Sequence, residues 1–309
     1  MIPFFLILAL FYFECKNSVE KKSSVNTSIS AKDSFCYDLN EPNTKFKLTK
    51  KLKEISGLTC YKDKWLVAVQ DERGAMYLID IKSGEIKDVI KFSGDGDFEG
   101  IACNDSIFYV IRADGVIFKI DKWENKKKIK SKKIKTNLGT INDTEGLAYD
   151  PVSNDLIIAC KGSSAIGYEA HKSRSVYAYD LDSANFNFTP VCTITRKKFK
   201  KFIKENFAKN PEYKPYKKEI KQAKKSIIIR PSAIAVHPIT KNYYILSAIS
   251  NTLIVMDRNN NIKHVKRLSE KQFEQAEGIA FSTDGDLFIS SEGLKKKARI
   301  YKFDYIPKS

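Results

Sequence analysis

The feature of this sequence that most restricts its fold is an internal repeat. A short polar step, a small residue and an apolar run recur five times, as EISGLTC (54–60), DFEGIAC (97–103), DTEGLAY (143–149), RPSAIAV (230–236) and QAEGIAF (275–281). Each copy is followed by a second apolar run and by a third that ends in Asp, such as AMYLID or VIFKID. Strand-length segments that recur every ~40 to 50 residues are typical of propeller blades with four antiparallel strands. The repeat therefore predicts an all-β propeller.

The spacing of the copies predicts the number of blades. The small residues at 57, 100, 146, 233 and 278 are separated by 43, 46, 87 and 45 residues. The long interval has room for a sixth blade. However, its segment 196–226 is rich in Lys and places four apolar residues at helical spacing, namely Phe199, Phe202, Ile203 and Phe207. We predict five blades and a helical Lys-rich insertion at about 196–226, with six blades as the alternative.

The last repeat has no segment for an outer strand, because residues 305–309 follow directly after its third apolar run. An unpaired outer edge would be open to aggregation. The segment KFKLTKKL (45–52) precedes the first repeat and has no place in it. We predict that this N-terminal segment pairs with the last blade and closes the ring, so that residues 36–309 form one propeller domain.

The order of these motifs resembles the SdiA-regulated (YjiK-like) family of five-bladed propellers, over roughly residues 36 to 306. The resemblance lies in EISGL, the pair Asp71 and Glu72, DFEGIA, DTEGLAYDP, RPSAIAVHPIT, QAEGIAF and the SSEG at 290–293. It implies a calcium-binding propeller of the bacterial cell envelope, distantly similar to NHL-repeat propellers, with no established reaction. The basic insertion departs from the family pattern.

One repeat position points to a metal site. The innermost strands of a propeller line its central channel, so the residues before the small residue form a ring of Ser56, Glu99, Glu145, Ser232 and Glu277. Three crowded carboxylates repel one another unless protons or a cation neutralise them, and irregularly placed oxygens suit Ca²⁺ better than Mg²⁺. We predict Glu99, Glu145 and Glu277 as Ca²⁺ ligands. The alternative is that they accept backbone hydrogen bonds.

Further acids are expected around the same end of the channel. Glu54, Asp97 and Asp143 lie two residues before ring positions, whereas Arg230 takes that place in the fourth blade. The ends of the second strands belong to the same face, and they place there Asp71, Glu72, Asp114 and Glu292. We interpret Asp71, Glu72, Asp97, Asp143 and Glu292, with Ser56 and Ser232, as supports of the metal ligands or acids of the channel mouth.

The N-terminus predicts export. Residues 2–13 are almost wholly apolar and a polar stretch follows, which we interpret as a signal peptide (1–15) and a flexible tether (16–35). The run is shorter than the ~20 residues that span a bilayer. Cys15 stands where a bacterial lipoprotein carries its lipid, although Tyr12, Phe13 and Glu14 match the processing site poorly. An uncleaved anchor or a cytoplasmic protein is the alternative to a membrane-attached envelope protein, periplasmic or on the outer surface.

Cysteines and charge add two exclusions. Cys60 and Cys103 share a repeat position, and Cys160 and Cys192 belong to the second and fourth strands of one blade, too far apart for a disulfide. Of 54 basic residues only eight are Arg, which disfavours nucleic acid despite the net charge of +17. The lysine clusters at 122–135 and 196–225 favour a solvated surface, with anionic lipid or a polyanion as the alternative.

Two functions fit these observations. We favour a noncatalytic, monomeric binding or scaffold protein with calcium in its channel and a protein, glycan or anionic lipid as partner. The alternative is a calcium-dependent hydrolase of lactonase or phosphoesterase type, with Asp71 or Glu72 as base. The sequence has no nucleophile elbow, phosphate loop or histidine pair at metal spacing, so no catalytic residue is assigned.

Overall fold

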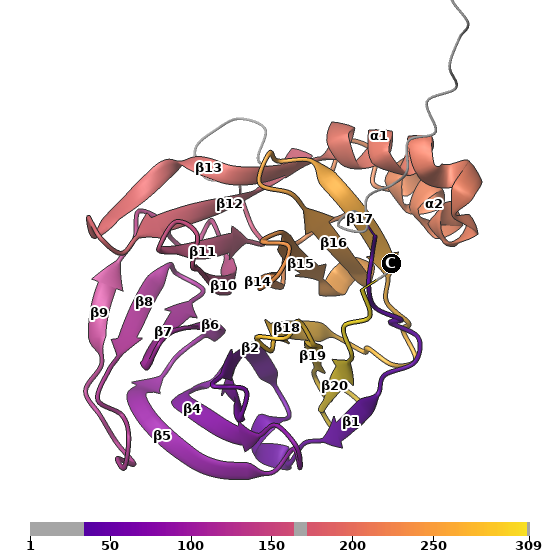
Figure 1. The fold of residues 1–309 in the computed structure, drawn as a ribbon. Helices are drawn as coiled ribbons and strands as arrows, with labels where there is room; N and C mark the ends of the chain where they lie inside the picture. The colour runs from indigo at the N-terminus through magenta and orange to yellow at the C-terminus, as the bar shows by residue number, and fades with distance from the viewer. Residues whose placement is uncertain (1–33, 164–171, 308–309) are drawn as a thin grey trace, which may run out of the picture.

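The computed structural model describes residues 34–163 and 172–307. They form five four-stranded antiparallel sheets arranged around a central axis (Figure 1). This confirms the five-bladed propeller. No helix in the described ranges is long and apolar enough to cross a membrane.

The first three blades are continuous in sequence. Blade 1 comprises β2 (Ile55–Tyr61), β3 (Trp65–Gln70), β4 (Arg73–Asp80) and β5 (Ile86–Asp95). Blade 2 comprises β6 (Phe98–Asn104), β7 (Ile107–Arg112), β8 (Val116–Ile120) and β9 (Lys132–Lys135). Blade 3 comprises β10 (Thr144–Asp150), β11 (Asp155–Cys160), β12 (Ser173–Asp180) and β13 (Asn185–Thr195). Cys160 and Cys192 are thus separated by β12, and the five cysteines of the described ranges are free, as predicted.

The last two blades are interrupted and completed by segments outside the repeat. Blade 4 comprises β14 (Ala233–Val236), β15 (Tyr243–Ser247), β16 (Thr252–Met256) and β17 (Ile262–Arg267). Blade 5 comprises β18 (Ala276–Phe281), β19 (Leu287–Ser291), β20 (Arg299–Phe303) and the N-terminal β1 (Thr44–Lys47). β1 runs antiparallel to β20, with Thr44 opposite Lys302 and Lys47 opposite Arg299. The predicted ring closure is confirmed.

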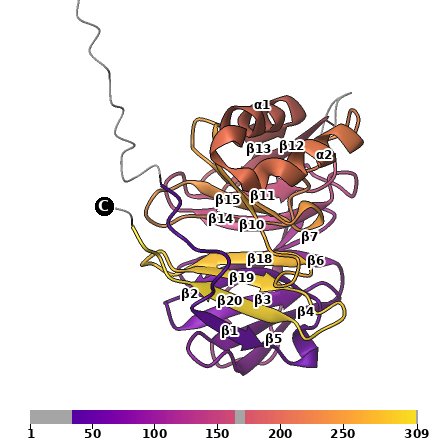
Figure 2. The ribbon, with the colours of Figure 1, turned by 90° about the vertical axis from the view of Figure 1, so that its right-hand side faces the viewer.

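The insertion consists of α1 (Arg196–Asn206) and α2 (Lys214–Gln222), joined by 3₁₀ turns at Phe207–Lys209 and Pro211–Tyr213. Both helices lie outside the ring of blades, and α1 contacts β13 and β17 (Figures 1 and 2). Phe199 and Tyr216 are almost completely buried and belong to the apolar cluster between blades 3 and 4. Tyr216 also shares a hydrogen bond with Thr252 of β16, at 2.9 Å. The lysine-rich face of the insertion is exposed, whereas its opposite face adds buried side chains to the core.

The hydrophobic core lies between the blades. Side chains of neighbouring sheets meet in apolar clusters, for example Val69 and Ile90 of blade 1 with Phe98 and Phe118 of blade 2. Near the axis the inner strands approach so closely that a Cβ on Gly57 would lie 2.6 Å from the backbone nitrogen of Ile101 in the next blade. This close approach explains the small residue in the repeat.

Residues 35–39, which we call the N-terminal strap, precede β1 and pack against blades 4 and 5. Phe35, Tyr37 and Leu39 are buried in one cluster with Tyr244 and Tyr301. The Tyr37 hydroxyl donates a hydrogen bond to the carbonyl of Gly285, at 2.6 Å. The strap therefore ties blades 4 and 5 together at the place where the ring closes.

Candidate functional site: the acidic end of the channel

The ring residues are positioned by β-bulges at the start of the inner strands. In four blades the register shifts at the ring position, for example between Phe98 and Gly100 and between Thr144 and Gly146. A bulge leaves one residue unpaired and redirects its side chain. That residue is Ser56, Glu99, Glu145 or Glu277 in the respective blade. The pattern Glu-Gly in the repeat is thus a bulge followed by a close backbone approach.

Burial and mutual repulsion make the ring carboxylates hard to ionise. Glu145 and Glu277 are buried, and Glu99 is half-buried. Burial, the charge of Glu145 and a hydrogen bond with Asp97 raise the pKa of Glu99 to about 10. Burial, Glu145 and Glu292 raise the pKa of Glu277 to about 8. Each shift favours the protonated form, because the charges around these groups are mostly of the same sign.

Sequence reasoning missed Lys161, a cation that lies among the carboxylates at this end. Its Nζ lies 2.5 Å from Oε1 of Glu145. Burial raises the pKa of Glu145, and Lys161 opposes that rise, so the pKa is about 7. Burial also disfavours the charged form of Lys161, but Glu145 and Glu277 outweigh it and its pKa is raised. Glu145 is therefore at least partly neutralised within the protein.

The signal for Lys161 was present in the repeat. The backbone N–H groups of Asp71, Lys161 and Glu292 occupy equivalent places, since each bonds to a carbonyl three residues before the small residue of its own blade. The end of the second strand thus provides an acid in blades 1 and 5 and a lysine in blade 3. An alignment of the second strands, read for charge, would have identified it.

The acids of the channel mouth are partly brought together. Burial, Asp71 and Glu54 raise the pKa of Glu292 to about 7, and burial and Glu54 raise the pKa of Asp71. Asp97 and Asp143 act on Glu99 and Glu145 in the same way. Glu72 lies beside Asp71 and acts on its pKa in both directions: a hydrogen bond from the Glu72 backbone lowers it, and the smaller effect of the Glu72 charge raises it. These residues surround one end of the channel.

Asp114 does not belong to this cluster of uncompensated acids. Its carboxylate forms an ion pair with Arg112, at 2.6 Å, and this contact lowers its pKa. The basic side of the mouth lies at blades 3 and 4, where Arg230 is exposed and lies near enough to Arg174 to lower its pKa, after the larger effect of burial. The mouth is therefore acidic toward blades 5, 1 and 2 and mixed toward blades 3 and 4.

The two serines of the ring are buried, but Ser232 is committed to the backbone. Its hydroxyl donates to the carbonyl of Ala276, at 2.8 Å, and accepts from the N–H of Ala248. The bond to Ala276 joins blade 4 to blade 5. Ser232 thus stabilises the framework of the ring, and Ser56 is buried at the equivalent position of blade 1.

The carboxylate oxygens at the acidic end are ligands of the type that a hard cation prefers. Oε2 of Glu277 is buried and has no hydrogen-bond partner within the described ranges, and Oδ1 of Asp71 is in the same state. A buried carboxylate oxygen without a donor is costly unless a proton or cation compensates it. Within residues 34–163 and 172–307, however, no three His, Cys, Asp or Glu side chains are grouped as a ready metal site. The carboxylates supply suitable oxygens that are not yet assembled around one point.

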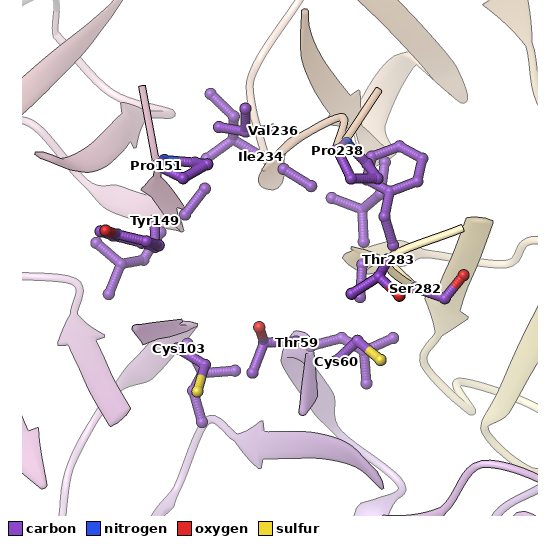
Figure 3. A pocket seen from close by; sticks show the side chains of 18 of the residues that line it. Thr59, Cys60, Cys103, Tyr149, Pro151, Ile234, Val236, Pro238, Ser282 and Thr283 are labelled. Carbon is purple, nitrogen blue, oxygen red and sulfur yellow. The ribbon is translucent and has the colours of Figure 1, made fainter. Parts of the chain in front are cut away.

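The opposite end of the channel has a different lining. There the ends of the inner strands enclose a cavity of about 270 Å³, and Figure 3 shows side chains such as Thr59, Cys103, Tyr149 and Val236 around it. Its acid, Asp63, accepts a hydrogen bond from the N–H of Thr283, at 2.9 Å. The buried acid at this end of β10, Asp150, is paired with Arg258, whereas Glu277 at the acidic end has no ion-pair partner in the described ranges.

The predicted lipid site and one histidine lie outside the described ranges, namely Cys15 and His171. His237 is fully buried, and its Nδ1 accepts hydrogen bonds from the N–H groups of Ile239 and Thr240. His264 packs against Phe35. Neither of these two histidines is part of the acidic end.

Comparison with known proteins gives a family and a fold. The sequence model of the family described as SdiA-regulated matches residues 38–180 and 193–303. No curated protein shows significant similarity to the chain. Among solved structures, Myxococcus xanthus glutaminyl cyclase is similar with a TM-score of 0.55 at 10% identity, over 87% of this chain and 97% of that one.

Two further structures are similar over most of their length. A luciferin-regenerating enzyme has a TM-score of 0.49 at 11% identity, over 85% of this chain and 95% of its own. The PQQ-bound aldose sugar dehydrogenase of Streptomyces coelicolor has a TM-score of 0.47 at 11% identity, over 85% and 99%. At such identities these likenesses concern the fold alone.

Proposed function

The chain belongs to the SdiA-regulated family, and on that premise we propose that it is a noncatalytic calcium-binding propeller that uses the acidic end of its channel. The observation that supports this most directly is the buried Oε2 of Glu277, which has no hydrogen-bond partner within the described ranges. It stands among carboxylates whose pKa values are raised first by burial and then by neighbouring acids, with a shortage of positive charge around them. A divalent cation would remove that shortage.

The residues that would hold the ion are Glu99 and Glu277, with Asp71 and Glu292 from the mouth. Glu145 joins them only if it exchanges Lys161 for the ion. A bound calcium ion would neutralise these charges and link inner strands of different blades across the axis. The side chains have to turn toward one point, since they are not grouped as ligands in this structure.

A noncatalytic role is favoured by what surrounds the carboxylates. Propeller hydrolysis at a metal needs a base that is not itself a ligand. The two described histidines lie elsewhere and pack among aromatic residues. Arg230, which is exposed beside Arg174 at blades 3 and 4, would suit an anionic group of a protein or glycan partner. We further propose that the N-terminal segment attaches the protein to the bacterial cell envelope.

The environment of Asp71 supports a second candidate function, a calcium-dependent hydrolase. Its Oδ1 is buried without a partner in the described part of the chain, and its pKa is raised, as a general base at a metal requires. A panel of lactones and phosphoesters with calcium tests this candidate. Turnover that Asp71→Asn abolishes, while calcium binding persists, would establish it.

Calcium titration after chelator treatment tests the main proposal. Calorimetry should show one calcium ion per chain, and calcium at a hundredfold excess over Kd should stabilise the fold by about 2.7 kcal/mol. Glu277→Gln should abolish or weaken both effects, and should leave the metal-free protein as stable as the parent or more so, because it removes repulsion. Glu85→Gln, at an exposed site of blade 1, is the matched control and should bind normally. A parent without calcium response, together with a destabilised Glu277→Gln, would show that the glutamates are structural.

A further inference from the structure

The helical insertion presents two stripes of lysine. Exposed lysines recur at i, i+3, i+4 and i+7 in both helices, which places four of them on one face of each helix. In α1 they are Lys197, Lys200, Lys201 and Lys204, and in α2 they are Lys214, Lys217, Lys218 and Lys221. We call these eight residues the lysine stripes.

The opposite faces of the same helices are committed to the propeller. Phe199 and Ile203 of α1 and Tyr216 and Ile220 of α2 are buried in the cluster between blades 3 and 4. The helices are thus held rigidly with their basic faces outward. No exposed large hydrophobic side chain lies in the described part of the insertion. A partner of the stripes must therefore be attracted by charge and not by an apolar wedge.

The acids of the insertion do little to neutralise the stripes. Glu219 is paired with Arg267 of β17, at 2.8 Å, and Glu212 faces Lys266, at 3.4 Å. Glu205 lies 3.8 Å from Lys201, but both side chains are exposed and such pairs are weak. Two of the three acids therefore face cations of the propeller, and the outward face stays strongly positive.

The N-terminal strap enters the domain beside this insertion. Lys266, which faces Glu212, also lies over the ring of Phe35, at 5.2 Å. Residues 35–40 and Glu212 line one groove. The 34 residues before the strap include the apolar run at 2–13, so a membrane attachment through them would begin beside the insertion that carries the lysine stripes.

We propose that the lysine stripes bind the surface of an anionic lipid membrane, close to the point where the N-terminal segment leaves the propeller. Lysine is a hydrated point charge suited to the diffuse potential of anionic headgroups, and each lysine near such a surface adds to the attraction. The one Arg of segment 196–226, Arg196, donates to the carbonyls of Ser226 and Ile220, so the stripes are not accompanied by a free guanidinium of the kind that specific phosphate or nucleic-acid recognition prefers. A short lipid or apolar anchor gives stable attachment only with a second signal, and the stripes supply that signal.

Vesicle partitioning of the full chain tests the proposal. Vesicles of neutral phosphatidylcholine report the contribution of the apolar N-terminus, and vesicles that also contain anionic phosphatidylglycerol report the added effect of charge. The full chain should partition at least about tenfold more strongly to the anionic vesicles at low salt, and the difference should vanish in high salt. Replacing the four α1 lysines by Gln should reduce the anionic preference about tenfold or more and leave partitioning to neutral vesicles unchanged.

Two further variants keep the test decisive. The four α1 lysines replaced by Arg should retain the anionic preference, which separates charge from damage to the helix. Exposed lysines at the outer part of blade 2 provide the matched control for net charge, namely Lys126, Lys128, Lys130 and Lys132. Their replacement by Gln should have a much smaller effect. Equal loss in this control, or no preference for anionic vesicles in the parent, would overturn the proposal, as would binding of the stripes to soluble heparin alone.

Discussion

Two regions of this propeller bury titratable side chains, and they do so in opposite ways. Around the N-terminal strap, His237 and Tyr37 are buried with their hydrogen bonds satisfied. The Nδ1 of His237 accepts two backbone N–H bonds, so its Nε2 is the donor to the Tyr37 hydroxyl, at 2.7 Å, and that hydroxyl donates to Gly285. At the acidic end of the channel, Glu277 keeps an unpaired oxygen and several acids share one lysine.

The comparison teaches that burial of a titratable group is not by itself a sign of function. Burial lowers the pKa of His237 to about 4, which keeps the ring neutral and in the state that its partners require. Burial raises the pKa of Glu277 to about 8, but no donor within the described ranges satisfies its second oxygen. The strap contact is complete within the chain, whereas the acidic end leaves buried carboxylate oxygens without a donor in the described ranges.

The largest expected effect on stability comes from deleting the N-terminal strap together with β1. Deleting residues 1–47 takes away the strap and β1, and exposes the edge of β20. Burial of Phe35, Tyr37, Leu39 and Phe46 alone suggests a loss of about 5 kcal/mol or more. We expect insoluble protein or a sharply lowered melting temperature in calorimetry. Deletion of residues 1–33 is the control, and equal melting of the two truncations would contradict the assignment.

The hydroxyl of Tyr37 is the group that satisfies the hydrogen bonds around the N-terminal strap. Tyr37→Phe removes the hydroxyl that Gly285 and His237 share, and should lower the free energy of unfolding by about 2 kcal/mol, since it leaves a buried carbonyl and ring nitrogen without a partner. Calcium binding should not change. Urea denaturation with and without calcium measures both, and a Tyr37→Phe protein as stable as the parent would remove the distinction between the regions.

Lys161→Met should affect the acidic end in two directions. The free energy of unfolding of the metal-free protein should fall by about 1 to 2 kcal/mol, because Glu145 stays buried without its cation. The expected loss is no larger because the Lys161 side chain is partly exposed and its charge is screened by solvent. Calcium affinity should increase severalfold, because a positive charge leaves the mouth. Lys87→Met, at an exposed pair with Glu85, is the control for both quantities. Weaker calcium binding in the Lys161 variant would refute the role of Lys161 as a resident counter-ion.

The smallest effect is a pH profile with opposite slopes. The folded-state pKa values of Glu145, Glu292 and Glu277 lie at about 7 to 8, above the ordinary 4.5, so their stabilisation is full below 4.5 and is lost as pH rises through 7 and 8. The pKa of His237 lies below its ordinary 6.5, so its stabilisation is full above 6.5 and is lost as pH falls through about 4. In chelator, these glutamates should make the melting temperature fall by a few degrees toward pH 9, and His237 should make it fall toward pH 4.

Calcium is the control for that profile. Ligation requires ionised carboxylates, so calcium should remove the alkaline decline and leave the acid decline unchanged. A melting temperature that stays flat from pH 6.5 to about 9 in chelator would show that the glutamates are not as poorly compensated as the structure indicates.

Much of the fold could be predicted because the repeat acts locally. The five copies of the polar step, small residue and apolar run specify an inner strand each, and their register gives the blade number without any knowledge of packing. The unpaired last blade and the unassigned segment at 45–52 predicted the closing strand, since an exposed edge has to be covered. The ring of Ser56, Glu99, Glu145, Ser232 and Glu277 followed from the same alignment.

The remainder depended on which side chains meet in space. The core contribution of the insertion was hidden because Phe199 and Tyr216 belong to helices whose docking partner lies elsewhere in the chain. The strap was likewise hidden, since Tyr37 and His237 are 200 residues apart in sequence.

The sequence by itself determined the repeat, the five blades and the carboxylates at one channel position, because these depend on periodicity. Only the tertiary structure decided which of those charges are compensated: Lys161 neutralises Glu145 and Arg112 neutralises Asp114, whereas Glu277 has no such partner in the described ranges. The physical reason is that ionisation energies depend on burial and on distances of a few ångströms between charges, which the order of residues along the chain does not specify.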